Sequence, residues 1–327
     1  MADGEEAAQA LWYVGPGRAE IRPEPLTALT DGFVRVRAIY GAISRGTEAL
    51  IAAGRVPVSE YQRMRAPFMA GSFPFPVKYG YSTVGRVEAG PDALFGRNVF
   101  VLHPHQTVFD VPVEAALPIA PEIPLSRAVL AANMETALNA TWDAAPGPFG
   151  RIAVVGAGVV GALIGFLCAR IEDAEVTLVD VDPSRAELAQ ALGLNFSGPD
   201  DAPADCDFVF HTSASGTGLT TAVNIAAEEA TIVELSWYGA GVVSVPLGGA
   251  FHSRRLKIVS SQVGKVAPSR RDSFTHRQRL EAAIKLTAHP HLDALLASAV
   301  PFYDLPERLP DILKPRSGVL CQLIDYT

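Results

Sequence analysis

The sequence predicts an α/β protein in which a doubly wound parallel sheet is joined to a β-rich domain. Three observations predict it: the length of 327 residues, the alternation of short apolar strands with helices from residue 151 onward, and the Pro- and Gly-rich strands before that point. A chain of this length exceeds what one hydrophobic core normally serves, so two domains are expected. The 49% of apolar and 19% of charged residues are typical of a compact globular protein.

The strongest motif opens the parallel sheet. A β-branched run, Ile152–Val155, is typical of a buried parallel strand, and it runs into a Gly-x-Gly-x-x-Gly turn and an apolar helix over 159–171. In such a turn the first glycine permits a tight bend, the second lets the backbone approach a pyrophosphate, and the third permits close helix packing. The helix N-terminus favours phosphate binding. The residues predicted to bind a dinucleotide here are Gly156, Ala157, Gly158, Val159, Val160 and Gly161.

The acid after the second strand bears on the choice of dinucleotide. The strand over 175–179 ends in Asp180, where a carboxylate can accept from both ribose hydroxyls of NAD and repel a 2′-phosphate. Asp182 is the alternative residue for this role, and Arg185 leaves NADP(H) as the alternative cofactor. We expect NAD(H) to be preferred, through Asp180.

The alternation then continues and extends the parallel sheet. Strands are predicted over 207–212, 231–236 and 256–261, with a helix over 218–229. Ligands of such sheets bind beyond the carboxyl ends of the strands. The residues predicted to face the cofactor there are Thr212, Ser213, Ser236 and Trp237.

The regions before and after the parallel sheet differ from it in predicted secondary structure. Short strands separated by turn residues are predicted over 32–38, 85–88, 98–102 and 107–111. A helix over 126–142, with Ser126 as its N-cap, leads into the parallel sheet. A helix over 275–288 and a final strand in the segment GVLCQLIDY close the chain.

Together these features resemble the medium-chain dehydrogenase/reductase superfamily, over nearly the whole chain. The motif GAGVVG and the segment GAISRGTEALIAAGRVP, Gly41 to Pro57, carry the resemblance, and the second is similar to the zinc-lacking branch of bacteriochlorophyllide a dehydrogenase. The resemblance implies a GroES-like catalytic domain over 1–125, a Rossmann NAD(P)-binding domain over 126–265 and a return segment over 266–327 that completes the catalytic domain.

The positions at which relatives hold zinc carry other residue types. The family's cysteine falls at Ser44 or Arg45, its histidine at Tyr81, and its third ligand at Ala132 or Asn133. The region 98–113, where a structural zinc lobe is expected, contains no cysteine. Zinc needs several nitrogen, sulfur or carboxylate ligands at defined positions, so no metal is expected. His103 and His105, with Glu48 nearby, are the alternative ligand set.

The resemblance assigns the chemistry to hydroxyl groups. Thr47 falls where the family's Ser or Thr contacts the substrate oxygen, and the phenol of Tyr81 can donate to that oxygen or act as a general acid. Glu48 either orients Tyr81 or anchors the turn. Arg45 has two alternative roles: it reaches a cofactor phosphate or a substrate carboxylate, or it is a solvated turn residue. Thr136 is a further expected cofactor contact.

The predicted function is therefore a zinc-independent NAD(H)-dependent oxidoreductase that interconverts an alcohol and a carbonyl of a small molecule. The alternatives are an NAD(P)H-dependent enone or quinone reductase and a non-enzymatic dinucleotide-binding protein. The net charge of −8 disfavours nucleic acid and anionic membranes as partners. Without a secretory signal or a membrane-spanning run, the chain is expected in the cytoplasm. The resemblance also implies a homodimer joined through the strand near 256–261.

Overall fold

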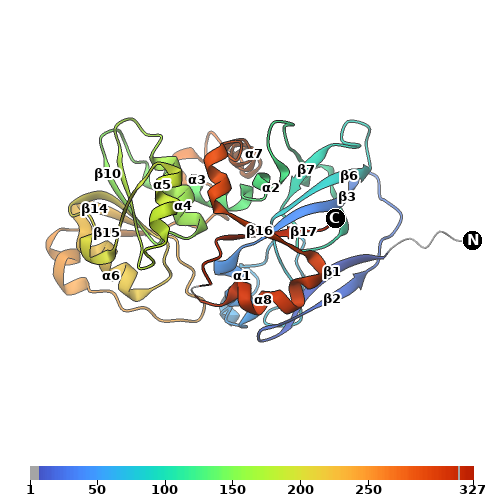
Figure 1. The fold of residues 1–327 in the computed structure, drawn as a ribbon, viewed down its shortest axis with the longest axis horizontal. Helices are drawn as coiled ribbons and strands as arrows, with labels where there is room; N and C mark the ends of the chain where they lie inside the picture. Colours follow the sequence, from blue (N-terminus) through green and yellow to red (C-terminus); the bar gives the residue numbers. More distant parts are fainter. Residues whose placement is uncertain (1–6, 316) are drawn as a thin grey trace, which may run out of the picture. The chain divides into compact units, whose positions relative to one another are not determined.

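The computed structural model describes residues 7–315 and 317–327, and its contacts divide the chain into two compact units (Figure 1). The first unit comprises Met1–Ala132 and Leu296–Thr327, and the second comprises Asn133–Leu295. The sequence analysis divides the chain after residues 125 and 265 instead. The roles assigned to the domains stay predictions. Among the described residues, no helix is long and apolar enough to cross a membrane.

The second unit is built on a six-stranded sheet with the order β12-β11-β10-β13-β14-β15, in which every paired strand is parallel. This order, which reverses direction beside β10, is that of a doubly wound dinucleotide-binding sheet. The strands are β10 (Arg151–Val155), β11 (Glu175–Val179), β12 (Asn195–Ser197), β13 (Cys206–His211), β14 (Ala226–Glu234) and β15 (Lys257–Ser260). The helices are α3 (Ala131–Ala144), α4 (Val159–Cys168), α5 (Arg185–Leu192), α6 (Gly216–Ile225) and α7 (His276–Leu286).

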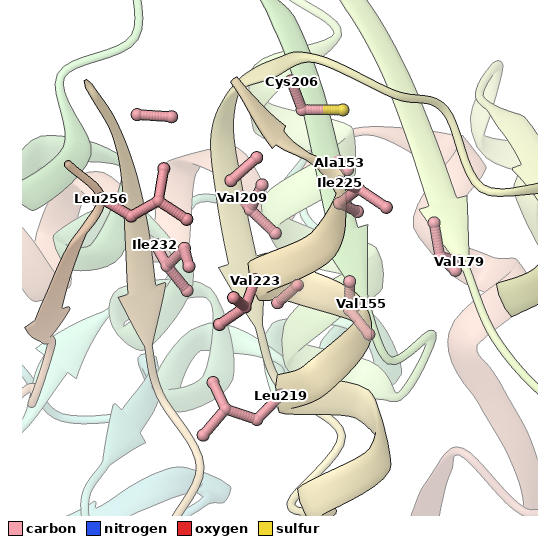
Figure 2. Packing of buried hydrophobic residues seen from close by; sticks show 13 residues of the cluster. Ala153, Val155, Val179, Cys206, Val209, Leu219, Val223, Ile225, Ile232 and Leu256 are labelled. Atoms are coloured by element: carbon pink, nitrogen blue, oxygen red, sulfur yellow. The ribbon is translucent and has the colours of Figure 1, made fainter. Parts of the chain in front are cut away.

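A continuous apolar layer lies between this sheet and α6. Figure 2 shows Leu219 and Val223 of α6 packed near Val155, Val209 and Ile232 of the strands. All of these side chains are buried, as are the free cysteines Cys168 and Cys206. Burial of this layer holds the strand ends, which carry the functional residues, in a fixed register.

The first unit holds a four-stranded sheet, β2-β1-β5-β4, and a seven-stranded sheet in which β16-β17-β3-β6-β7-β9 follow one another and β8 also pairs with β3. The carboxy-terminal strand β17 pairs antiparallel with β3, as expected of the predicted final strand. The strands are β1 (Ala8–Gly15), β2 (Arg18–Glu24), β3 (Phe33–Ile43), β4 (Ala70–Gly71), β5 (Val77–Lys78), β6 (Thr83–Ala89), β7 (Asn98–Val101), β8 (Val108–Pro112), β9 (Leu117–Pro118), β16 (Leu296–Pro301) and β17 (Cys321–Asp325). The helices are α1 (Arg45–Ala52), α2 (Leu125–Ala128) and α8 (Leu305–Leu313).

Two predicted helices are wrong in their extent. The helix predicted over 126–142 is two helices, α2 and α3, and Ser126 lies inside α2, whose N-cap is Pro124. The break has a tertiary cause, because the carbonyl of Val129 accepts a hydrogen bond from the Ser82 hydroxyl. A carbonyl engaged by a side chain competes with the helical hydrogen-bond ladder.

The helix predicted over 218–229 ends at Ile225, and the following residues begin β14. The Glu228–Glu229 pair favours a helix locally. Ala226, however, already pairs with Cys206 of β13, so the pairing of the sheet outweighs local propensity at this point.

Candidate functional site

The three glycines of the turn after β10 have distinct surroundings. Gly156 has φ +109°, and a Cβ there would lie 2.6 Å from the Ser213 nitrogen. A Cβ at Gly161 would lie 2.0 Å from the Gly156 oxygen, whereas a Cβ at Gly158 would meet nothing within 4 Å. The first glycine therefore permits the bend, the third permits close packing of α4, and the backbone at Gly158 is open to a ligand.

Asp180 lies at the carboxyl end of β11, directly beside this turn. One carboxylate oxygen accepts from the Ala157 backbone nitrogen at 2.6 Å, and the other accepts from the Asp182 nitrogen at 2.9 Å. Each oxygen of a carboxylate has two acceptor positions, so the group can still accept from ribose hydroxyls.

The alternative residue Asp182 is engaged in its own loop. Its carboxylate accepts from the nitrogen and the hydroxyl of Ser184, at 3.0 and 2.7 Å, and it forms an ion pair with Arg185 at 3.4 Å. This arrangement is an Asx turn that leads into α5. Both carboxylates are thus engaged by local hydrogen bonds, Asp180 within the glycine turn and Asp182 in the loop before α5.

The remaining predicted cofactor residues of the second unit lie on several elements. Thr212 donates to the Gly156 carbonyl at 2.7 Å, which ties the end of β13 to the glycine turn. The Ser236 hydroxyl accepts from the Ala214 nitrogen at 3.1 Å. Trp237 is half-buried after β14, Val159 and Val160 form the first turn of α4, and Thr136 is half-buried in α3.

A polar pair that the sequence pattern did not predict lies beside Ser213 and Ser236. His211 and Glu234 occupy paired positions in the ladder of β13 and β14, and His211 Nδ1 lies 2.7 Å from a Glu234 oxygen. His211 Nε2 lies 2.7 Å from the Ser213 hydroxyl. The available signal was a histidine and a glutamate, each at the end of a strand whose preceding residues, Phe208–Phe210 and Ile232–Val233, are apolar.

In the first unit, three hydroxyl groups meet at the start of α1. The Tyr81 phenol donates to the Ser44 hydroxyl and lies 3.2 Å from the Thr47 hydroxyl. Burial raises the pKa of Tyr81 above its ordinary value, although the two hydroxyls oppose the change. The phenol thus stays protonated near neutral pH, and it can donate a hydrogen bond. The predicted pair Thr47 and Tyr81 is therefore in contact.

Glu48 follows Thr47 in α1, and its side chain is fully buried. Its carboxylate accepts from the Tyr13 hydroxyl at 2.6 Å and from the Ser44 nitrogen at 2.7 Å, and His105 Nε2 lies at 3.0 Å. Glu48, and not the Ser44 side chain, engages the backbone at the N-cap of α1. The geometry favours the anchoring role for Glu48.

Arg45 also serves the local structure. Its guanidinium donates to the backbone carbonyls of Ile312 at 2.7 Å, of Lys314 at 3.0 Å, and of Val319. Three carbonyl acceptors hold the charged group against the end of α8 and the segment that follows it. The structure therefore favours an anchoring role for Arg45 over the predicted cofactor contact, and it corrects the alternative of a solvated turn residue.

The residues at the zinc positions do not fit zinc. Ser44 and Tyr81 present hydroxyl groups that bond one another, and His105 is paired with Glu48. His103 faces elsewhere, stacked on Phe109 with ring centroids 3.7 Å apart. Within residues 7–315 and 317–327, no group of three or more His, Cys, Asp or Glu residues is placed to hold a metal ion.

Comparisons with known proteins give matches among solved structures. No family model matches the chain, and no curated protein does. L-Idonate 5-dehydrogenase from Escherichia coli matches with a TM-score of 0.80 at 14% identity, over 98% of each chain. An alcohol dehydrogenase from Escherichia coli solved with NADH has a TM-score of 0.77 at 16% identity, over 98% of this chain and 99% of that one.

A protein from Sinorhizobium meliloti, named as a zinc-binding dehydrogenase and solved with NADP, also matches with a TM-score of 0.77 at 15% identity, over 98% of this chain and 100% of that one. At these identities the similarity establishes the fold. This chain therefore shares the fold of these structures, in which a β-rich unit is joined to a unit built on a doubly wound parallel sheet.

Proposed function

We propose that the protein is an NAD(H)-dependent oxidoreductase that interconverts an alcohol and a carbonyl without zinc. The observation that carries the proposal is the position of Asp180, whose carboxylate is bonded to Ala157 within the glycine turn. A carboxylate at this position favours the free ribose hydroxyls of NAD over the phosphate of NADP. The matched structures support the same reaction class, because they are named as dehydrogenases and two of them were solved with NADH or NADP.

The residues of the second unit would hold the cofactor in a defined way. The open backbone at Gly158 and the free N–H groups of the first turn of α4 suit a pyrophosphate. Asp180 would accept from the ribose hydroxyls, while Thr212 holds the turn in shape. When bound, the nicotinamide supplies hydride exchange with the substrate carbon.

The hydroxyl cluster of the first unit would act on the substrate oxygen. The Tyr81 phenol, kept protonated by burial, donates to that oxygen, and Thr47 and Ser44 carry a proton to or from it. A placed donor contributes roughly 2.7–4 kcal/mol to stabilising developing negative charge, so about two donors can supply several kcal/mol. Glu48 is a positioning residue, because it fixes the backbone of Ser44.

The cofactor assignment is tested by titrating the protein with NADH and NADPH and following tryptophan fluorescence. NADH should bind more tightly. Asp180→Ala should weaken NADH binding by about tenfold or more, because it removes the hydrogen bonds from the ribose hydroxyls to a charged group, and it should reduce the preference over NADPH. Asp182→Ala is the matched control and should keep the preference. Binding of neither dinucleotide, or an unchanged preference in Asp180→Ala, would contradict the assignment.

The catalytic assignment is tested with a panel of secondary alcohols and ketones. A Thr47→Val, Tyr81→Phe double variant should bind NADH normally and lose turnover. Normal turnover in this variant would rule out the hydroxyl cluster. Oxidation of NADH by enones, with no reaction of saturated ketones, would support the enone reductase instead.

We also propose that the protein is a cytoplasmic homodimer. β15 is the terminal strand of the six-stranded sheet, and the side chain of Val259 within it is 37% exposed. An unpaired strand edge of this kind favours pairing with a second copy.

A further inference from the structure

A serine, an imidazole and a carboxylate lie in series at the carboxyl ends of β13 and β14. The Ser213 hydroxyl is 2.7 Å from His211 Nε2, and His211 Nδ1 is 2.7 Å from a Glu234 oxygen. The imidazole is fully buried between the two partners, whereas Ser213 is only half-buried. All three residues belong to the second unit, so their arrangement depends on that unit alone.

The hydrogen bonds around Glu234 define the direction in which protons are donated. Glu234 accepts from the Ser236 nitrogen at 2.7 Å and from the Tyr238 hydroxyl at 3.1 Å. Burial would raise the pKa of Glu234, but the hydrogen bonds from His211 and Ser236 lower it. An ionised Glu234 holds the proton of His211 on Nδ1, so the lone pair of Nε2 faces the Ser213 hydroxyl.

The other side of Ser213 faces the start of α6. Its hydroxyl lies 3.0 Å from the hydroxyl of Ser215, which is the N-cap residue of α6. The Ser215 hydroxyl in turn accepts a hydrogen bond from the Gly218 nitrogen at 3.0 Å. A Cβ at Gly218 would lie 2.2 Å from the Ser213 hydroxyl, so glycine is required for this approach. The first turn of a helix stabilises negative charge through its N–H groups and its dipole.

We propose that Ser213 is an activated nucleophile, with His211 as its general base and Glu234 as the residue that orients the imidazole, and that it accepts acyl groups from small activated esters. The Ser213 oxygen attacks the ester carbonyl while His211 Nε2 takes the hydroxyl proton. The bond from the acyl carbon to the leaving oxygen then breaks, and His211 returns the proton to the departing alcohol. Water then attacks the acyl carbon while His211 Nε2 takes its proton. The bond from the acyl carbon to the Ser213 oxygen breaks, the acid leaves, and His211 returns the proton to Ser213.

A purely structural role is the competing explanation, because the same bonds would tie β13 to β14. Chemical reactivity distinguishes the two, since a structural tie predicts an inert hydroxyl. Phenylmethylsulfonyl fluoride is a suitable probe: the serine oxygen bonds to sulfur, the sulfur–fluorine bond breaks, and hydrogen fluoride is released.

The experiment treats the full chain with this reagent and locates the adduct by peptide mass spectrometry. One adduct per chain is expected, at Ser213. Ser213→Ala should abolish it, and His211→Gln should slow it by about 100-fold or more, the usual contribution of a general base. Ser273→Ala removes an exposed serine and is the matched control, which should label at the normal rate.

A second readout is the hydrolysis of p-nitrophenyl acetate, which should follow the same order among the variants. Thermal unfolding midpoints identify any variant that fails to fold. If a variant fails to fold, the presence or absence of the Ser213 adduct in the wild-type protein distinguishes a reactive serine from an inert structural one. The absence of an adduct at Ser213, or its formation at an unchanged rate in folded His211→Gln, would overturn the proposal.

Discussion

At the residue scale, the turn glycines differ in what an added methyl group would meet. At Gly161 the methyl would meet the Gly156 oxygen at 2.0 Å and the Thr212 hydroxyl at 2.6 Å, so the turn or the helix has to move. Gly161→Ala should therefore destabilise the protein by about 1–3 kcal/mol, the usual cost of overpacking. The measurement is the thermal unfolding midpoint.

Gly158→Ala is the matched control for this prediction. Nothing lies within 4 Å of its added methyl, so its unfolding midpoint should change little while NADH affinity falls. Equal destabilisation by the two substitutions would show that steric contact does not distinguish them.

The buried histidine His103 predicts a dependence of stability on pH. Its ring stacks on Phe109, and burial lowers its pKa from the ordinary 6.5 to about 3. Between these values the unfolded chain binds a proton that the folded chain does not. His103 therefore contributes stability above pH 6.5 that is lost as the pH falls toward 3, by about 1.4 kcal/mol per pH unit.

The ring of phenylalanine preserves the stack but cannot titrate. The free energy of unfolding should fall between pH 7 and pH 5 by about 2 kcal/mol more in wild type than in His103→Phe. Urea unfolding at the two pH values measures the difference. Parallel losses in the two proteins would contradict the assigned pKa.

At the element scale, a buried ion pair joins α3 to α7. Arg279 is 1% exposed, and its guanidinium bonds Glu135 at 3.0 Å and Asn139 at 2.5 Å. Burial raises the pKa of Glu135, and Arg279 opposes this change. Arg279→Met should cost about 3–5 kcal/mol, because it leaves an unpaired buried carboxyl group.

Replacing both partners separates the loss of the pair from the loss of packing. The Arg279→Met, Glu135→Met double variant should be more stable than Arg279→Met alone, since no buried charge remains. Denaturant unfolding measures the free energy of unfolding of the single and the double variant. If the double variant is less stable than the single one, the packing of the Glu135 side chain contributes more to the free energy of unfolding than the cost of its unpaired charge.

At the scale of the whole molecule, the proposed dimer depends on an exposed strand edge. Val259→Lys places a charge on β15, and charged side chains protect edges from pairing. Light scattering should give a dimer mass for wild type and a monomer mass for this variant. Val242→Lys, at a position that is 99% exposed in a loop, is the control and should remain dimeric. A monomer mass for wild type would reject the dimer.

Local sequence patterns predicted the elements whose formation depends on neighbouring residues in the chain. The apolar run before Gly156 and the acid at Asp180 predicted β10, the turn, α4 and β11, and β11 lies at the predicted residues. These predictions succeed because a buried parallel strand needs β-branched residues and a tight turn needs glycine, wherever the rest of the chain lies. The apposition of Tyr81 and Thr47 was expected only through the resemblance to a known superfamily.

Features that depend on partners distant in the chain became visible in the folded protein. Ser82 divides the predicted helix into α2 and α3, and β13 draws residue 226 into a strand. Arg45 is held by carbonyls more than two hundred residues away, and His211 meets Glu234 because β13 and β14 are neighbours in register. Such contacts are absent from local sequence patterns, since the energy of a hydrogen bond depends on which groups the fold brings within reach.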